Sequence, residues 1–273
     1  MTPQAGDVVI FLHLPKTAGS TLMHVLESQY GSNRILKLYE STFGDEVARL
    51  SADELRGTRV IAGHFYFGVH AWLPGSFRYL TFLREPVARV LSHYEFVRRQ
   101  PGHYLHEAAS TLGLADYVRF CGGAEPNNDQ TRLLAGAELA TSDGTSSPEM
   151  LAAATKNLDL HAAVGLTEAF DASVVLMRRT FGWRRPLYVS RNVAGRRHAE
   201  AVLSTEAREI IEAHNSLDVE LYRYACERFR RDVAEYGARF RRDEWISKQV
   251  NAVYGRLQGL SSLRVGPSMT TGT

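Results

Sequence analysis

The stretch from Asp7 to Tyr30 places an apolar strand directly before a short turn and a helix, and this order constrains the fold more than any other feature. The run Val8-Val9-Ile10-Phe11-Leu12 is mostly β-branched or aromatic, which is typical of a strand buried in a parallel sheet. Pro15 ends the strand, and a helix is predicted from Ser20 through about Tyr30. We therefore predict a single α/β domain, with a central parallel sheet, helices on both faces and ligands at the carboxyl ends of the strands.

The turn Pro15-Lys16-Thr17-Ala18-Gly19 carries the chemistry of this segment. A helix N-terminus presents backbone N–H groups that have no partner in the helix, and its dipole favours an anion. Lys16 adds a positive charge, and Ser20 and Thr21 add hydroxyl donors. These groups predict a phosphate or sulfate site. The alternative is an ordinary turn with a lysine on the surface, because short motifs also arise by chance.

The turn differs from the phosphate-binding loop of nucleotide triphosphatases. That loop reads G-x-x-x-x-G-K-S/T, with the lysine after the second glycine. In this chain Lys16 precedes Gly19, and His13 stands where the first glycine is expected. The residue order therefore disfavours a site of the kinase type.

A second strand, turn and helix follow in FRYLTFLREPVARVLSHYEFVRRQ, which runs from Phe77 to Gln100. The strand is predicted over Tyr79 to Leu83. Pro86 suits the first helical turn, where its missing N–H costs nothing. Arg84 comes directly after the strand, and Ser92 lies about two helical turns further on.

Together the two segments resemble the cofactor signatures of sulfotransferases that use 3'-phosphoadenosine 5'-phosphosulfate. The quoted residues are HLPKTAGST and REPVARVLSHY, and they are most similar to the carbohydrate (Golgi-type) branch, which includes heparan sulfate 2-O-sulfotransferase. The resemblance implies a P-loop-like sulfotransferase fold, a first signature that holds the 5'-phosphosulfate, and a second that holds the 3'-phosphate. It assigns cofactor binding to Pro15, Lys16, Thr17, Ala18, Gly19, Ser20 and Thr21, and to Arg84 and Ser92. A salt bridge for Arg84 and a solvated position for Ser92 are the alternatives.

His64 follows another predicted strand, Thr58 to Gly63, and opens a loop. A structural histidine among aromatic residues is one interpretation. The other comes from the resemblance, because Gly63-His64-Phe65-Tyr66-Phe67 is similar to a G-H-x-x-F element of heparan sulfate 2-O-sulfotransferase whose histidine is the catalytic base. That enzyme also has a histidine two positions earlier, where this chain has Ala62. His70 is a second candidate for the base.

Two later segments also resemble parts of carbohydrate sulfotransferases. The segment Asn127 to Arg132 contains N-x-Q-x-R, which suggests a place on the acceptor side of the cleft; the alternative is a helix start capped by Asn128. The basic segment Arg191 to Arg197 is similar in position to a loop that closes over the nucleotide. Arg196 or Arg197 is therefore expected to pair with the 3'-phosphate, unless the segment is only a surface loop.

The remaining elements complete the predicted domain, which spans residues 1–240 and is followed by a C-terminal helix and flexible tail over 241–273. An N-cap serine and acidic residues predict a helix from Ser51. Short strands are predicted at Arg34 to Tyr39, Ala162 to Leu166 and Leu187 to Ser190, one long helical stretch at Thr205 to Tyr236, and a last helix at Trp245 to Leu263.

Composition and charge exclude several classes of protein. The 273 residues are 44% hydrophobic and 23% charged, with a formal net charge of +2, so nucleic acid is not an expected partner. No run of about 18 or more apolar residues is present, and we expect no membrane span and a cytoplasmic location. The two cysteines, Cys121 and Cys226, share no metal-binding spacing, and no metal is expected.

The resemblance implies sulfuryl transfer from 3'-phosphoadenosine 5'-phosphosulfate to an acceptor hydroxyl. Catalysis of this kind rests mainly on positioning and electrostatics. Lys16 would neutralise the leaving-group oxygen, and His64 would remove the acceptor proton. A glycan, a lipid or a small molecule would each fit as acceptor. The alternatives are a P-loop kinase that uses ATP and magnesium, for which Glu85 is the available acid, and a non-catalytic protein that binds polyanions through its arginine pairs.

Overall fold

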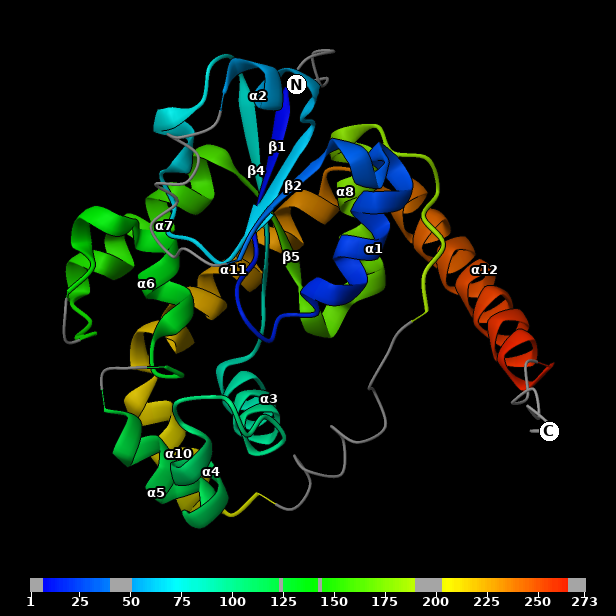
Figure 1. Ribbon diagram of the computed structural model, residues 1–273. Helices are drawn as coiled ribbons and strands as arrows, with labels where there is room; N and C mark the ends of the chain where they lie inside the picture. The colour runs from blue at the N-terminus through cyan, green and yellow to red at the C-terminus, as the bar shows by residue number, and fades with distance from the viewer. Residues whose placement is uncertain (1–6, 40–50, 123–124, 142–143, 190–202, 265–273) are drawn as a thin grey trace, which may run out of the picture.

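The computed structural model describes residues 7–39, 51–122, 125–141, 144–189 and 203–264, and it is built around a five-stranded parallel sheet (Figure 1). The strand order is β2-β3-β1-β4-β5. The strands are β1 Val8–Leu12, β2 Ile35–Leu38, β3 Val60–Gly63, β4 Phe77–Leu83 and β5 Ala162–Leu166. The single α/β domain that the sequence predicts is confirmed.

The strand order creates a switch point between β1 and β4. The chain leaves β1 toward β2 on one side of the sheet, whereas it leaves β4 toward β5 on the other. Leu12 at the end of β1 lies opposite both Gly63 of β3 and Thr81 of β4, so the carboxyl ends of these strands share one edge. Ligands of open α/β sheets bind in the crevice outside such a switch point.

Helices cover both faces of the sheet because alternate strand residues point to opposite sides. On one face Val9 and Phe11 pack with α1 (Gly19–Tyr30) and α8 (Phe170–Phe181). On the other face Ile10 and Leu12 pack with α7 (Pro148–His161) and α11 (Ser216–Ala234). Figure 1 shows the two helix layers to the right and left of the sheet.

A third apolar cluster lies beyond the carboxyl edge of the sheet, in the lower part of Figure 1. It joins α3 (Pro86–Arg98), α4 (His106–Thr111), α5 (Leu114–Cys121) and α10 (Thr205–His214). The other helices are α2 (Ala52–Gly57), α6 (Asp129–Ala135) and the long α12 (Gly237–Arg264). The helix that follows Arg84 therefore belongs to a helical layer that faces the ends of the strands.

One predicted element is wrong. Residues 187–189 form no strand, because the N–H of Tyr188 donates to Oδ1 of Asn251 on α12 (3.0 Å) instead of to a neighbouring strand. The helical stretch predicted from Thr205 to Tyr236 is confirmed, and it consists of two helices. It breaks at Asn215 between α10 and α11, where the side-chain oxygen of Asn215 accepts the N–H of Asn128 (3.0 Å).

Several predictions fall outside the described residues. These include Ser190, the basic segment with Arg196 and Arg197, and the tail after residue 264. The division at residue 240 stays a prediction, although α12 begins at Gly237 and is held to α8 by Asp243, which binds Arg178 (2.5 Å) and Arg179 (2.6 Å). Within the described part of the chain, no helix combines the length and hydropathy that crossing a membrane requires.

Candidate functional site

The predicted site residues follow three adjacent strands and lie at one edge of the sheet. His64 directly follows β3, Lys16 comes four residues after the end of β1, and Arg84 directly follows β4. Because β1 lies between β3 and β4, the turn with Lys16 stands between the other two residues. The structure thus brings together three residues that are far apart in the sequence, at the switch point of the sheet.

The turn after β1 has an unusual backbone. Lys16 and Ala18 both have a φ of 68°, in the left-handed region that L-residues rarely adopt. Such residues cost roughly 1–3 kcal/mol each and concentrate at functional sites. The buried hydroxyl of Thr17 donates to the carbonyl of Leu14 (2.8 Å) and holds the turn closed. Alternating conformations of this kind direct successive backbone N–H groups into one concavity, which suits an anion.

The residues that form this turn and flank it carry hydrogen-bond donors and no acid. From His13 to Thr21 the side chains include one ammonium, three hydroxyls and one imidazole, and no carboxylate. Ala18 occupies the N-cap position of α1 without a capping side chain, so the first N–H groups of that helix face the turn. Hydrogen-bond donors and a positive charge fit an anion rather than a metal ion.

His64 has a defined tautomer. Its Nδ1 lies 2.6 Å from the carbonyl oxygen of His13, and a carbonyl only accepts, so Nδ1 carries the proton and donates it. The lone pair of the neutral ring is then on Nε2. Burial lowers the pKa of His64 below its usual value, although the hydrogen bond to His13 opposes this. His64 is therefore neutral near pH 7 and can accept a proton at Nε2.

His13 and Tyr39 surround His64, although the sequence motifs do not identify either as part of the site. The rings of His13 and His64 are 4.5 Å apart, and Nδ1 of His13 lies 3.0 Å from the hydroxyl of Tyr39. Burial, together with the charges of His64 and Lys16, lowers the pKa of His13 to about 3. Knowledge of the strand register would have identified both residues. His13 and Tyr39 directly follow Leu12 and Leu38, which both pair with Gly63, the residue before His64.

Glycine is required at two places in this arrangement. A Cβ on Gly19 would collide with the imidazole of His13, and a Cβ on Gly63 would collide with the carbonyl oxygen of Leu38. The ring of His13 therefore rests on the first residue of α1. The second histidine beside the candidate base is His13, which directly follows β1, whereas the position two residues before His64 is the buried Ala62.

Arg84 links the two turns. Its side chain is only 2% exposed, its Nη1 donates to the carbonyl of Lys16 (3.2 Å), and its Nε lies 3.9 Å from Glu168. The ammonium of Lys16 lies 3.9 Å above the ring of Phe96 on α3, a favourable cation–π geometry. Ser92 is half-buried on α3. The cofactor roles of these residues stay predictions.

Two candidate residues, Glu85 and His70, are held by structural hydrogen bonds. The carboxylate of Glu85 caps α3 by accepting the N–H groups of Val87 (3.1 Å) and Ala88 (2.7 Å), so the acid that a kinase site would need is engaged. His70 lies 3.0 Å from the hydroxyl of Tyr79, a residue in the first half of β4. That half is remote from the strand end that carries Arg84.

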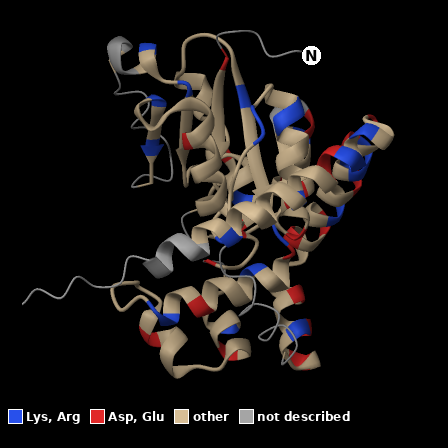
Figure 2. Cartoon of the chain, turned by 90° about the vertical axis from the view of Figure 1, so that its right-hand side faces the viewer, with Lys and Arg blue, Asp and Glu red and all other residues tan. Residues whose placement is uncertain are grey.

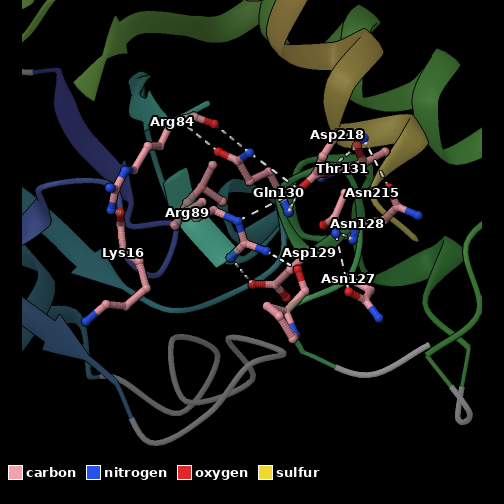
Figure 3. A network of polar contacts seen from close by, with 12 residues as sticks. Lys16, Arg84, Arg89, Asn127, Asn128, Asp129, Gln130, Thr131, Asn215 and Asp218 are labelled. Atoms are coloured by element: carbon pink, nitrogen blue, oxygen red, sulfur yellow. Dashed lines mark hydrogen bonds and ion pairs between the residues drawn. The ribbon is translucent and has the colours of Figure 1, made fainter. Parts of the chain in front are cut away.

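The segment Asn127 to Arg132, which resembles an element of carbohydrate sulfotransferases, contacts the start of α11 (Figure 3). Asn128 sits at the N-cap of α6 but does not cap it. Its side-chain oxygen accepts the N–H groups of Leu217 (3.0 Å) and Asp218 (3.1 Å) at the start of α11. In return, Asp218 accepts the N–H of Thr131 in α6 (2.7 Å). Each helix is thus capped by a residue of the other.

One group of residues with metal-binding side chains occurs among those described, namely His93, His103 and Glu125, with donor atoms within 4.8 Å of one another. Nε2 of His93 is bonded to Glu125 (2.9 Å), and Nδ1 of His103 accepts the N–H of Leu105 (3.2 Å). Neutral His103 then carries its proton on Nε2. Hydrogen bonds therefore already occupy donor atoms of these side chains, and we assign no metal to the group.

Within the described part of the chain, the arginine pairs Arg98-Arg99 and Arg178-Arg179 do not form a separate basic face. Arg178 and Arg179 both bind Asp243, and Arg98 lies 3.8 Å from Glu95. In Figure 2, basic and acidic residues are interspersed over the helices. This distribution offers little support for a protein that binds polyanions only through its surface.

The comparisons with known proteins point to sulfotransferases. Human heparan-sulfate 6-O-sulfotransferase 1 is 29% identical over 278 aligned residues, which cover 83% of this chain and 66% of the relative. Heparan-sulfate 6-O-sulfotransferase 3-B of Danio rerio is 30% identical over 183 residues, which cover 56% of this chain and 43% of the relative. A protein-tyrosine sulfotransferase of Arabidopsis thaliana is 35% identical over 97 residues, 33% of this chain and 17% of the relative.

The heparan-sulfate relatives are 6-O- rather than 2-O-sulfotransferases, and the chain spans 43% and 66% of the length of the two described above. The sequence resemblance to carbohydrate sulfotransferases is confirmed at the level of the family. A family model for galactose-3-O-sulfotransferase matches residues 2–261 of this chain. The chain therefore belongs to the galactose-3-O-sulfotransferase family of carbohydrate sulfotransferases.

Proposed function

We propose that this protein transfers a sulfuryl group from 3'-phosphoadenosine 5'-phosphosulfate to a hydroxyl of a carbohydrate. The observation that carries the proposal is the meeting of Lys16, His64 and Arg84 at the switch point of the sheet. Such a transfer needs a neutral base and two cations at one edge of the sheet. His64 would be the base, and Lys16 and Arg84 would be the cations. Family membership supports the same reaction.

The residues present fit the donor nucleotide. The two left-handed residues, Lys16 and Ala18, and the uncapped N-terminus of α1 form an all-donor concavity for the 5'-phosphosulfate. Ser20 and Thr21 add hydroxyls at its rim. On the other side of the switch point, Arg84 and Ser92 would hold the 3'-phosphate, since a guanidinium binds phosphate with two parallel hydrogen bonds.

When bound, the nucleotide supplies an activated sulfuryl group and leaves as the bisphosphate. Lys16 would neutralise the charge that develops on the leaving oxygen, and backbone N–H groups of the turn would hold the sulfuryl oxygens. Both contributions come from groups that are already in position before the reaction. Little reorganisation is then needed as the charge moves.

His64 would remove the proton of the acceptor hydroxyl at Nε2. The carbonyl of His13 keeps the proton of the ring on Nδ1, so the accepting nitrogen faces away from the backbone. Burial lowers the pKa of His64, which keeps the base unprotonated near neutral pH. The role of base for this residue also follows from the G-H-x-x-F likeness in the sequence.

The acceptor we propose is a sugar hydroxyl. The names of the matched family and of the heparan-sulfate relatives describe enzymes that act on galactose and heparan sulfate. The motif similarity to 2-O-sulfotransferase includes the candidate base. It does not indicate which hydroxyl of the sugar receives the sulfuryl group. A galactose-terminated oligosaccharide and N-sulfated heparan chains without O-sulfate are therefore the first acceptors to test.

Transfer of radiolabelled sulfate from the donor nucleotide to these two acceptors tests the proposal. We expect label in the glycan with wild-type protein and none with Lys16→Ala. Label transferred to the glycan from the γ-phosphate of ATP, with magnesium and without any sulfate transfer, would instead identify a kinase. Glycan binding without any transfer, in protein that does not bind the nucleotide product, would identify a polyanion-binding protein.

A further inference from the structure

We infer that Gln130 is a positioning residue for the nucleotide, because it fixes the backbone of Arg84 against the helical layer. The inference rests on the proposed function and goes beyond it by naming a residue that touches neither donor nor acceptor. Gln130 belongs to the segment that the sequence placed on the acceptor side. In the structure its side chain turns to the phosphate-binding arginine instead (Figure 3).

The contact is a matched pair of hydrogen bonds. Oε1 of Gln130 accepts the N–H of Arg84 (3.0 Å), and Nε2 of Gln130 donates to the carbonyl of Arg84 (3.0 Å). Arg84 lies just beyond β4, where the ladder of the sheet no longer pairs its backbone. A buried N–H and C=O must find partners, and one amide side chain supplies both, as a neighbouring strand would.

Gln130 is itself anchored at a buried carboxylate. Oδ2 of Asp218 accepts the backbone N–H of Gln130 (3.3 Å) and lies 3.4 Å from its Nε2. Oδ1 of Asp218 accepts the hydroxyl of Thr131 (2.8 Å) as well as its N–H. Gln130 and Asp218 are both fully buried. The position of Arg84 is therefore tied through Gln130 to the start of α11.

A buried arginine holds the acids of this network in place. Arg89, one helical turn into α3, lies 3.9 Å from Asp218 and 3.2 Å from Asp129. Arg89 follows Arg84 in the same signature, so α3 and Arg84, two residues before it, are both fixed to α6 and α11. The backbone of Arg84 is thus fixed by Gln130, and its guanidinium is held by the carbonyl of Lys16 (3.2 Å), which is the requirement for a preorganised phosphate contact.

The amide of glutamine matches this site. The contact requires one acceptor and one donor on a single planar group. Methionine has a similar length and neither function, while glutamate keeps the acceptor but loses the donor and places a second carboxylate beside Asp218. We therefore expect Gln130→Met to disturb the 3'-phosphate contact of Arg84 while it leaves the rest of the nucleotide site intact.

The experiment compares two nucleotides by calorimetric titration without magnesium. Adenosine 3',5'-bisphosphate carries the 3'-phosphate, and adenosine 5'-monophosphate lacks it. Wild-type protein should prefer the bisphosphate by about ten- to a hundredfold, the value of a charge-assisted contact of roughly 1.5–3 kcal/mol. Gln130→Met should lower this preference by about three- to tenfold, through weaker binding of the bisphosphate alone.

Two further variants make the result specific. In Arg84→Ala protein the preference should already be lost, and adding Gln130→Met should change it no further, because both act through one contact. Asn157→Leu is the matched control, since the amide of Asn157 donates to carbonyls at the other end of α6 (2.8 and 3.3 Å). It should lower stability and keep the wild-type preference.

The outcomes separate the inference from the proposed function. A full preference in Gln130→Met, combined with its loss in Arg84→Ala, would overturn the inference alone. Equal weakening of both nucleotides by Gln130→Met would also overturn it, because that is the behaviour of a general structural defect. A wild-type protein without any preference would overturn the proposed function and the inference with it. If Gln130→Met does not fold, Gln130→Asn provides the same comparison, because it adds no charge and its amide is one methylene shorter than the contact with Arg84 requires.

Discussion

At the scale of single residues, the candidate base is oriented by a backbone carbonyl rather than by a carboxylate. The oxygen of His13 accepts the Nδ1 proton of His64 at 2.6 Å, so the tautomer is set without a negative charge in contact with the ring. A carboxylate partner would raise the pKa of a histidine, whereas burial lowers the pKa of His64. The ring is therefore ready to accept a proton over a wide pH range.

We predict that His64→Ala keeps the fold and binds adenosine 3',5'-bisphosphate nearly as wild type does. Turnover should fall by about 10²–10⁴-fold, the usual loss when a positioned base is removed. The base is active when deprotonated, so wild-type turnover should rise with pH. Because the pKa of His64 is lowered, the midpoint of that rise should lie below the ordinary histidine value of about 6.5, and the variant should lack it.

The matched control is His70→Ala, which removes a histidine that contacts Tyr79 and not the strand ends. It should keep the wild-type dependence on pH. Steady-state values of kcat/KM between pH 5 and 8 provide the measurement, because they report the pKa of the free enzyme. Near-wild-type turnover in His64→Ala protein would contradict the assignment of the base.

At the scale of elements, the sequence predicted the strands, turns and helices whose formation depends on residues adjacent in the chain. The strand, turn and helix at Asp7 to Tyr30 and the one at Phe77 to Gln100 are both present. Contacts between distant segments were not predictable. The break at Asn215 exists because its side chain binds the backbone of Asn128, and the backbone of Tyr188 bonds to Asn251 of α12 instead of joining the sheet. Local periodicity carries no signal for either contact.

The reciprocal caps of α6 and α11 give a second example. The sequence offered Asn128 as the cap of its own helix, but its oxygen accepts two N–H groups of α11 instead. Two helix N-termini that face each other would repel through their dipoles. The acids at the junction, Asp129 and Asp218, offset this, and Arg89 and Arg132 lower the pKa of Asp129 against the effect of burial.

We predict that Asn128→Gly destabilises the protein by about 1–3 kcal/mol, because two N–H groups of α11 lose their acceptor. Asn128 has a φ of 49°, which glycine adopts without strain. Asn128→Ala should therefore cost about 1–2 kcal/mol more, since alanine disfavours this region. Urea unfolding midpoints measure both differences.

The control for this comparison is Asn33→Gly, at an exposed position outside the junction. It should change stability by less than about 0.5 kcal/mol, as is usual for surface substitutions. Equal stability of Asn128→Gly and wild-type protein would show that the contacts across the junction contribute nothing.

At the scale of the whole molecule, the site exists because of the strand order. The turns after β1 and β4 become neighbours only when the two strands are adjacent and their connections leave in opposite directions. The two signatures were visible in the sequence, and so was His64. The neighbours of His64, namely His13 and Tyr39, depend on strand register, and the role of Gln130 depends on the packing of α6 against the end of β4. These could not be predicted from spacing.

The central claim is that the two turns bind one nucleotide through two separate anions and without a metal. Thermal unfolding in the presence of adenosine 3',5'-bisphosphate, with EDTA present, tests it most directly. A ligand specific to the native state raises the melting temperature, with a free-energy gain of about 2.7 kcal/mol at a hundred times its dissociation constant. The account predicts a clear rise with the bisphosphate under these conditions and a much smaller one with ATP. A rise that occurs only with ATP and magnesium would contradict it.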